Sequence, residues 1–316
     1  MAYLYLILGL LGLLLGSDLA VRGSVSVAHR FGWPSWLTGL LLLALGTSLP
    51  ELFVSATSAV EHSELAFGNL FGSNAFNVGL VLAAGLLFKG QAQLKAKSVR
   101  LPSLLLLLFG SILVFLVEYA GDALRIIGVV LLLTYVVMTA MAFMGRGELP
   151  IDDDADPGMH WALPLASLAT LGGFALLAVA AHFFLDGALG LADQFGWGEG
   201  FAGFVITAAG TSAPELFTSL RALRLGHAGA IFGNVVGSNA FNLLIAGGTV
   251  CLIADPHNDF TSLDRQLWVN MVVTLVLFIP AIVPTTARPI SVRAYQAMGS
   301  ALALGWLGAA WWVFQA

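Results

Sequence analysis

The stretch GTSLPELF at residues 46–53 recurs as GTSAPELF at residues 210–217. Each copy is followed by a second related stretch, GNLFGSNAFN at residues 68–77 and GNVVGSNAFN at residues 233–242. Both copies place a carboxylate, hydroxyls and amides inside otherwise apolar sequence. Polar groups are costly in segments apolar enough to enter lipid, so by default they mark a functional site. The doubled motif therefore indicates both the fold and the candidate site.

The composition is that of a polytopic membrane protein. Hydrophobic residues make up 59% of the chain and charged residues 10%, whereas soluble domains carry about a quarter charged residues. Apolar runs of roughly 20 residues, the length that crosses a bilayer as a helix, recur through the sequence. The first run lacks a basic flank and a cleavage site, so we interpret it as a span and not as a signal peptide. The single cysteine, Cys251, excludes an intramolecular disulfide and a cysteine-based metal site.

We expect an all-α integral membrane protein with ten transmembrane helices, two of them broken. The second helix is expected to break between Gly46 and Pro50, and the seventh between Gly210 and Pro214. Proline removes a backbone donor, and its ring obstructs the carbonyl four residues earlier. The predicted spans are about 2–21, 35–60, 65–88, 101–118, 122–144, 160–190, 199–223, 229–253, 266–286 and 292–313.

The duplication divides the chain into two repeats of five helices each. Residues 1–144 form the first repeat, with its motif at 46–77, and residues 160–316 form the second, with its motif at 210–242. Because five is odd, equivalent helices cross the bilayer in opposite directions, as in the inverted repeats of many secondary transporters. Residues 145–159 form an acidic linker between the repeats.

The basic residues predict the orientation, because short cytoplasmic loops carry an excess of Lys and Arg. If both termini are outside, all of the 13 Lys and Arg residues except Arg125 and Arg265 fall on the inner side. The sequence therefore predicts an N-out, C-out topology. The acidic linker then lies in the cytoplasm, and we interpret it as a solvated segment.

The two motifs predict a site made only of oxygen ligands. A helix broken at proline leaves backbone carbonyls without partners, which is tolerated in a bilayer only where the break faces protein or water. Each second stretch adds a serine and an asparagine four residues apart, on one helix face. Oxygen ligands suit hard cations, and a flexible shell of them favours Ca²⁺ over Mg²⁺. The candidate ligands are Thr47, Ser48, Glu51, Ser73, Asn77, Thr211, Ser212, Glu215, Ser238 and Asn242.

Two glutamates balance one Ca²⁺ or two Na⁺, so these ions would compete for shared ligands, as an antiporter requires. Three other functions stay open. Ca²⁺/H⁺ exchange is one, because a carboxylate in apolar surroundings can also hold a proton. A passive channel is another, although channels usually close a pore with a ring of subunits. A membrane-embedded enzyme is the third, but no nucleophile or metal-hydrolase motif accompanies the glutamates, so we expect a secondary transporter and not an enzyme.

Two further pairs of polar residues lie within or next to the predicted spans. Asp18 has Arg22 one helical turn further on, which predicts an ion pair along one helix face. His182 and Asp186 are likewise one turn apart in the sixth span, where the histidine is a secondary candidate for proton handling.

The paired motifs resemble the two alpha-repeats of the Ca²⁺/cation antiporter superfamily, and above all its prokaryotic sodium/calcium exchanger branch. The resemblance covers essentially all ten predicted spans. It implies an ion site built by helices 2, 3, 7 and 8, and helices 1 and 6 that slide across this core. It also implies export of Ca²⁺ in exchange for Na⁺ by alternating access, across a prokaryotic cytoplasmic (inner) membrane.

The resemblance also implies roles for individual residues. Glu51 and Glu215 would be the central Ca²⁺ ligands, and the Thr47 and Thr211 carbonyls would complete their site. The residues implied for flanking Na⁺ sites or for the centre are Ser48, Ser73, Ser212, Ser238, Asn77 and the carbonyl region of Ala208.

Asn242 departs from the family pattern, which carries an aspartate at this position. The site therefore has one ionisable group fewer, and H⁺ or another monovalent cation is an alternative to Na⁺. Ca²⁺ and Na⁺ are transported ions, and no cofactor is expected. The expected partners are these ions, or H⁺, and the lipid bilayer, with no nucleic acid; the oligomeric state is left open.

Overall fold

The computed structural model describes residues 1–60, 63–89, 101–144, 161–194, 208–256, 260, 263–279 and 291–315. All regular structure in these ranges is helical, which confirms the all-α class. Six helices are long and apolar enough to cross a membrane, and one bent pair of helices would make a seventh. The six are Ala2–Arg30, Ala66–Leu87, Gly121–Met144, Leu163–Gly187, Gly229–Ile253 and Val292–Phe314.

The other predicted spans are covered to different extents. The bent pair is Ser35–Thr47 followed by Leu49–Ser58, with an angle of 43° between its halves. A shorter apolar helix, Ser103–Tyr119, lies where the fourth span is predicted. Residues 199–207 of the seventh span and 280–286 of the ninth lie outside the described residues, as does the linker 145–159. The count of ten helices therefore stays a prediction.

The two helices that carry the second stretch of each motif form the centre of the molecule. In the apolar parts of Ala66–Leu87 and Gly229–Ile253, 83% and 78% of the residues are buried, against 17–33% in the other four long spans. Each central helix widens into a π-helical turn in its middle, and such turns are frequent at functional sites. The first runs through α5 (Ser63–Phe76), η2 (Asn77–Leu82) and α6 (Ala83–Lys89), and the second through α13 (Ala228–Ala240), η7 (Phe241–Ala246) and α14 (Gly247–Ile253).

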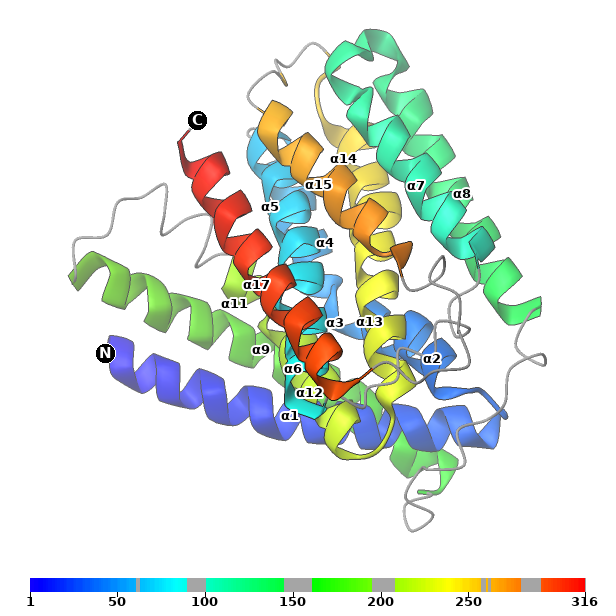
Figure 1. Cartoon of the computed structure of the whole chain (residues 1–316), viewed down its shortest axis with the longest axis vertical. Helices are drawn as coiled ribbons and strands as arrows, with labels where there is room; N and C mark the ends of the chain where they lie inside the picture. The colour runs from blue at the N-terminus through cyan, green and yellow to red at the C-terminus, as the bar shows by residue number, and fades with distance from the viewer. Residues whose placement is uncertain are drawn as a thin grey trace.

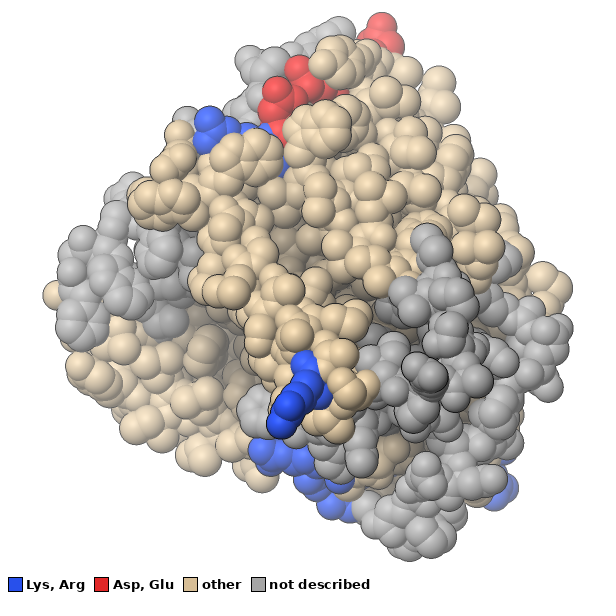
Figure 2. Space-filling view, in the orientation of Figure 1, with Lys and Arg blue, Asp and Glu red and all other residues tan. Residues whose placement is uncertain are grey.

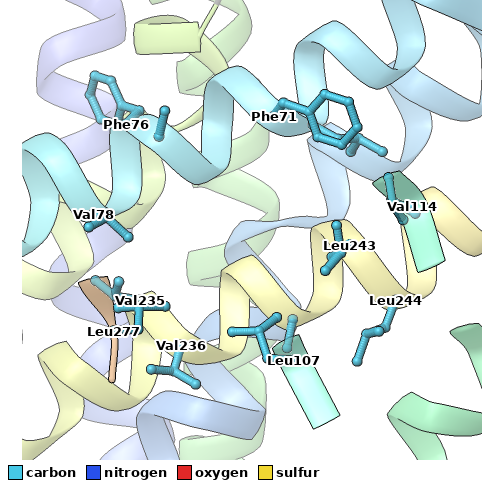
Figure 3. Close-up of a cluster of buried hydrophobic side chains, with 14 of the residues drawn as sticks. Phe71, Phe76, Val78, Leu107, Val114, Val235, Val236, Leu243, Leu244 and Leu277 are labelled. Carbon is cyan, nitrogen blue, oxygen red and sulfur yellow. The ribbon is translucent and has the colours of Figure 1, made fainter. Parts of the chain in front are cut away.

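Apolar side chains fill the space around the two central helices (Figure 3). Phe71 and Phe76 come from α5, Leu243 and Leu244 from η7, and Leu107 from α7 (Leu101–Phe115). Dispersion contacts of this kind hold membrane helices together, because lipid is as apolar as the side chains themselves. The core therefore fixes the two central helices relative to each other.

Two long helices, α1 (Ala2–Arg30) and α9 (Leu163–Gln194), lie side by side and cross the upright helices at a steep angle (Figure 1). Their backbones approach closely at glycines. A side chain at Gly173 would meet the backbone of Ala20, and one at Gly9 would meet the backbone of Phe184. Small residues at a helix interface permit this close approach in membrane proteins.

An ion pair links α1 to the rest of the bundle. Arg22 Nε donates to Asp18 Oδ1 at 2.6 Å, which confirms the predicted pair. Arg221 of α12 (Ala213–Arg224) donates to the same carboxylate oxygen through Nε, also at 2.6 Å, and this contact was not predicted. The predicted neighbours His182 and Asp186 lie 3.5 Å apart and are both exposed.

The remaining helices cover the sides of the molecule. Figure 2 shows Lys, Arg, Asp and Glu side chains toward the two ends of this face, with residues of other types between them. Many large apolar side chains are exposed along the peripheral helices, as a lipid-facing surface requires. The remaining elements on this periphery are η3 (Val117–Tyr119), η4 (Gly121–Ala123), α8 (Leu124–Met144), α15 (Asp264–Val276) and α17 (Val292–Phe314).

The α1–α9 interface predicts opposite outcomes for two adjacent glycines. Gly173→Ala would force its methyl group into the backbone of Ala20 and is expected to destabilise the protein by about 1–3 kcal/mol. Gly172→Ala meets no atom within 4 Å and is exposed, so it should be neutral or slightly stabilising. Thermal unfolding of both purified variants in detergent measures the difference, and equal melting temperatures would contradict this packing.

Candidate cation-binding site

The first stretch of each motif breaks its helix at a serine. Ser48 has φ −91° and ψ 5°, between α3 (Ala44–Thr47) and α4 (Leu49–Ser58). Ser212 has φ −92° and ψ 7°, between α11 (Ala208–Thr211) and α12. These almost identical angles confirm both predicted breaks. Each new helix has a proline as its second residue and a glutamate as its third, in the first turn, where the free N–H groups favour a negative charge.

The serine at each break donates a hydrogen bond to the glutamate that follows the other break. Ser48 Oγ donates to Glu215 Oε1 at 2.8 Å, and Ser212 Oγ donates to Glu51 Oε1 at 3.2 Å. Ser238 Oγ donates to Glu215 Oε1 at 3.5 Å. These reciprocal bonds bring together two carboxylates that are far apart in the sequence, as predicted from the doubled motif.

Both glutamates are buried without a positive partner. Glu51 has 0% and Glu215 1% of its surface exposed, and the Oε2 atom of each has no hydrogen-bond partner. Among the described residues, no Lys, Arg or His forms an ion pair with either of them. A buried charge is costly unless it is paired, protonated or bound to a metal. The site therefore requires a cation or protons.

Two asparagines add neutral oxygens from the π-helical turns. Asn77 Nδ2 in η2 donates to Asn239 Oδ1 at 3.1 Å, and Asn242 Nδ2 in η7 donates to Asn74 Oδ1 at 3.3 Å. Each amide thus uses its nitrogen in a bond to the opposite helix. The Oδ1 atoms of Asn77 and Asn242 stay buried without a hydrogen-bond partner.

Together these residues supply four buried oxygens that lack a hydrogen-bond partner. Two carry charge, from Glu51 and Glu215, and two are neutral, from Asn77 and Asn242. Carboxylate and amide oxygens are the ligands that Ca²⁺ prefers. Within the described ranges no group of three or more His, Cys, Asp or Glu side chains is arranged to hold a metal ion.

The other predicted ligands take different positions. Ser73 Oγ and Thr211 Oγ1 lie 3.4 Å apart in the interior. Thr47 Oγ1 donates to the Leu43 carbonyl at 2.9 Å, so its hydroxyl is used within its own helix. Ala208 is the first residue of α11, and the role of its carbonyl stays a prediction.

Five further asparagines belong to this polar interior and were not predicted. Asn69 and Asn234 each donate to a serine of the helix that follows the break, Ser55 and Ser219, at 3.1 and 3.0 Å. Asn69 and Asn234 occupy the same position in the two motif copies, and so do Asn74 and Asn239. The repeat could therefore have identified all four. The fifth, Asn270 in α15, lies in neither motif, and only its polarity in an apolar helix could have marked it.

Comparison with known proteins now identifies the family. Residues 1–144 and 165–315 match the family model described as sodium/calcium exchanger protein. The chain belongs to this exchanger family. The expected membership and the class of cation antiport are thereby confirmed.

Individual relatives match this exchanger over most of its length. It is 32% identical over 289 residues to the putative antiporter CaxA of Alkalimonas amylolytica, covering 88% of this chain and 89% of that protein. It is 31% identical over 283 residues to the inner membrane protein YrbG of Escherichia coli (strain K12), covering 86% of each. Its structure is similar to that of the sodium-calcium exchanger NCX_Mj soaked with Na⁺ and Sr²⁺, with a TM-score of 0.74, 26% identity and 98% coverage of both chains.

The unpaired oxygens predict that a bound cation stabilises the exchanger. Ca²⁺ at 100 times its dissociation constant should stabilise the folded protein by about 2.7 kcal/mol, because only the folded state assembles the ligands. Tryptophan fluorescence during heating in detergent would measure the shift in Tm. Glu215→Gln should abolish the shift, whereas Asp122→Asn, a matched change at an exposed position, should keep it. An equal shift in both variants would place the ion elsewhere.

Proposed function

We propose that this protein exports Ca²⁺ in exchange for Na⁺ by alternating access. The observation that carries the proposal is the pair of buried glutamates, Glu51 and Glu215, each with an unpaired Oε2 atom. Two carboxylates neutralise one Ca²⁺ or two Na⁺, but not both loads together. Binding of one ion type therefore displaces the other, and this competition couples the two fluxes.

We propose specific roles for the residues of the site. Glu51 and Glu215 are the charged Ca²⁺ ligands, and the Asn77 and Asn242 oxygens complete the centre. The unpaired state of these four oxygens supports this assignment. Further ligands, for the centre or for flanking Na⁺ sites, are the Thr47 and Thr211 carbonyls, the hydroxyls of Ser48, Ser73, Ser212 and Ser238, and the Ala208 carbonyl.

We also propose ten helices arranged as two inverted repeats of five, N-out and C-out in a prokaryotic cytoplasmic membrane. The equal backbone angles of Ser48 and Ser212 support the repeat, as do their reciprocal bonds to the two glutamates. In inverted repeats the substrate binds where the two halves meet, near the bilayer midplane. The Asp18–Arg221 ion pair falls on the side that the basic residues assign to the cytoplasm.

Coupling to H⁺ is the second candidate, and Asn242 favours it. An amide at this position removes one negative charge that would help to hold Na⁺. The two buried carboxylates can take up protons when the metal leaves, which would avoid unpaired buried charge. Export of Ca²⁺ through the same ligands would be unchanged.

Removal of either central charge is expected to stop transport. Glu51→Gln and Glu215→Gln each leave the remaining carboxylate to hold a divalent ion alone, which should weaken binding more than about a hundredfold. Uptake of ⁴⁵Ca²⁺ into Na⁺-loaded proteoliposomes would measure the loss, with Asp122→Asn as the matched control. Retained uptake in both glutamine variants would refute the assignment of these carboxylates.

Imposing one ion gradient at a time should identify the counter-ion. An outward Na⁺ gradient should drive ⁴⁵Ca²⁺ uptake into wild-type proteoliposomes, and an outward K⁺ gradient should not. The same uptake is then measured with a proton gradient and no Na⁺. Uptake driven by the proton gradient alone would replace Na⁺ by H⁺ as the coupling ion.

A further inference from the structure

Asn270 joins the site from outside the repeated motifs. It lies on α15, which packs against α5, and only 1% of its surface is exposed. Its Oδ1 atom accepts a hydrogen bond of 2.9 Å from Asn74 Nδ2. We infer that Asn270 is a positioning residue that turns the Asn242 oxygen toward the transported cation, and this inference rests on the proposed function.

The mechanism is a chain of oriented amides. A primary amide has a donor end and an acceptor end, so in a chain of amides the end that one residue presents decides which end its neighbour must present. Asn270 Oδ1 takes the donor end of Asn74, which leaves Asn74 Oδ1 facing Asn242. Asn242 must then offer its Nδ2 to Asn74. Its own Oδ1 is thereby left unpaired and available to a cation.

The equivalent chain on the other side ends differently. Asn77 Nδ2 donates to Asn239 Oδ1 at 3.1 Å, and Asn239 Nδ2 donates to the backbone carbonyl of Asn74 at 3.3 Å. A backbone carbonyl cannot exchange its acceptor for a donor, so this orientation is fixed. Only the chain that ends at Asn242 depends on a side chain from a third helix.

Loss of the Asn270 acceptor would leave the orientation of Asn74 undecided. In Asn270→Leu, the Asn74 amide can turn its nitrogen toward Asn242 without losing a bond. Asn242 would then accept with Oδ1 and present its N–H₂ group to the cation site. An N–H donor repels a cation, so the turned state must be reversed before Ca²⁺ binds, and the apparent affinity falls.

The same helix supplies a matched control. Thr274 lies one turn after Asn270 on α15, is buried, and its hydroxyl lies 2.9 Å from Ser111 Oγ of α7. Thr274→Val removes an interhelical hydrogen bond of similar depth that does not belong to the amide chain. A purely structural effect of losing a buried polar contact on α15 should therefore appear in both variants.

The test compares half-saturation and maximal rate of ⁴⁵Ca²⁺ uptake in proteoliposomes. Asn270→Leu is expected to raise the Ca²⁺ concentration for half-maximal uptake about tenfold or more, with the maximal rate within about twofold of wild type. Thr274→Val should change neither by more than about twofold. Equal half-saturation in wild type and Asn270→Leu, or an equal rise in both variants, would overturn the inference.

A double-mutant cycle separates orientation from general damage. Equilibrium ⁴⁵Ca²⁺ binding to purified Asn242→Ala should be weaker than to wild type, and adding Asn270→Leu should weaken it no further. Additive losses would overturn the inference, and so would failure of purified Asn270→Leu to fold while Thr274→Val folds. Absence of any Ca²⁺ uptake by wild type would instead refute the proposed function, and the inference with it.

Discussion

The rest of the structure depends on the burial of two carboxylates that have no basic partner among the described residues. Hydroxyls donate to one oxygen of each of Glu51 and Glu215, and the proposed cation would satisfy the other. The serine breaks supply those hydroxyls, and the first helical turns after the breaks supply free N–H groups beside the carboxylates. Each helix break thus completes the environment of the acid on the opposite segment.

The packing around this centre divides into two kinds. The central helices are buried on nearly all sides. The second of them also packs closely against the helix Ser35–Thr47 at glycines, where Gly233 faces the backbone of Trp36 and Gly39 faces that of Ala230. The α1–α9 pair is equally tight within itself but lies across the bundle as a separate layer (Figure 1). The molecule thus consists of a closely packed core and a closely packed two-helix unit beside it.

Much of this could be predicted from the sequence, because the constraints are local and written twice. The proline-linked breaks and the Asp18–Arg22 pair follow from spacing along single helices, and the meeting of the two glutamates follows from the duplication of the motif. The partners of the amides could not be predicted in the same way. Asn77 and Asn242 bond to residues more than 160 positions away, and periodicity along one helix contains no information on such contacts.

Two further features have no repeat to reveal them. Asn270 lies outside both motifs. From the sequence, Arg221 counts only as one of the basic residues on the cytoplasmic side. The π-helical turns also shift the helical phase within each central span, so residues before and after them change faces relative to a regular helix. Spacing rules of the regular helix therefore describe each half of a central span, but not the whole.

The ion pairs of Asp18 with Arg22 and Arg221 should be more sensitive to salt than the buried contacts of the molecule. The carboxylate is shared by Arg22 and Arg221, and about a third of its side chain is open to solvent, at 37%. Mobile ions screen exposed charges, with a screening length of about 8 Å at physiological ionic strength, and they screen buried groups much less. The ion pair between α1 and α12 therefore weakens as electrolyte accumulates in the adjoining compartment, while the serine–glutamate bonds of the interior are affected much less.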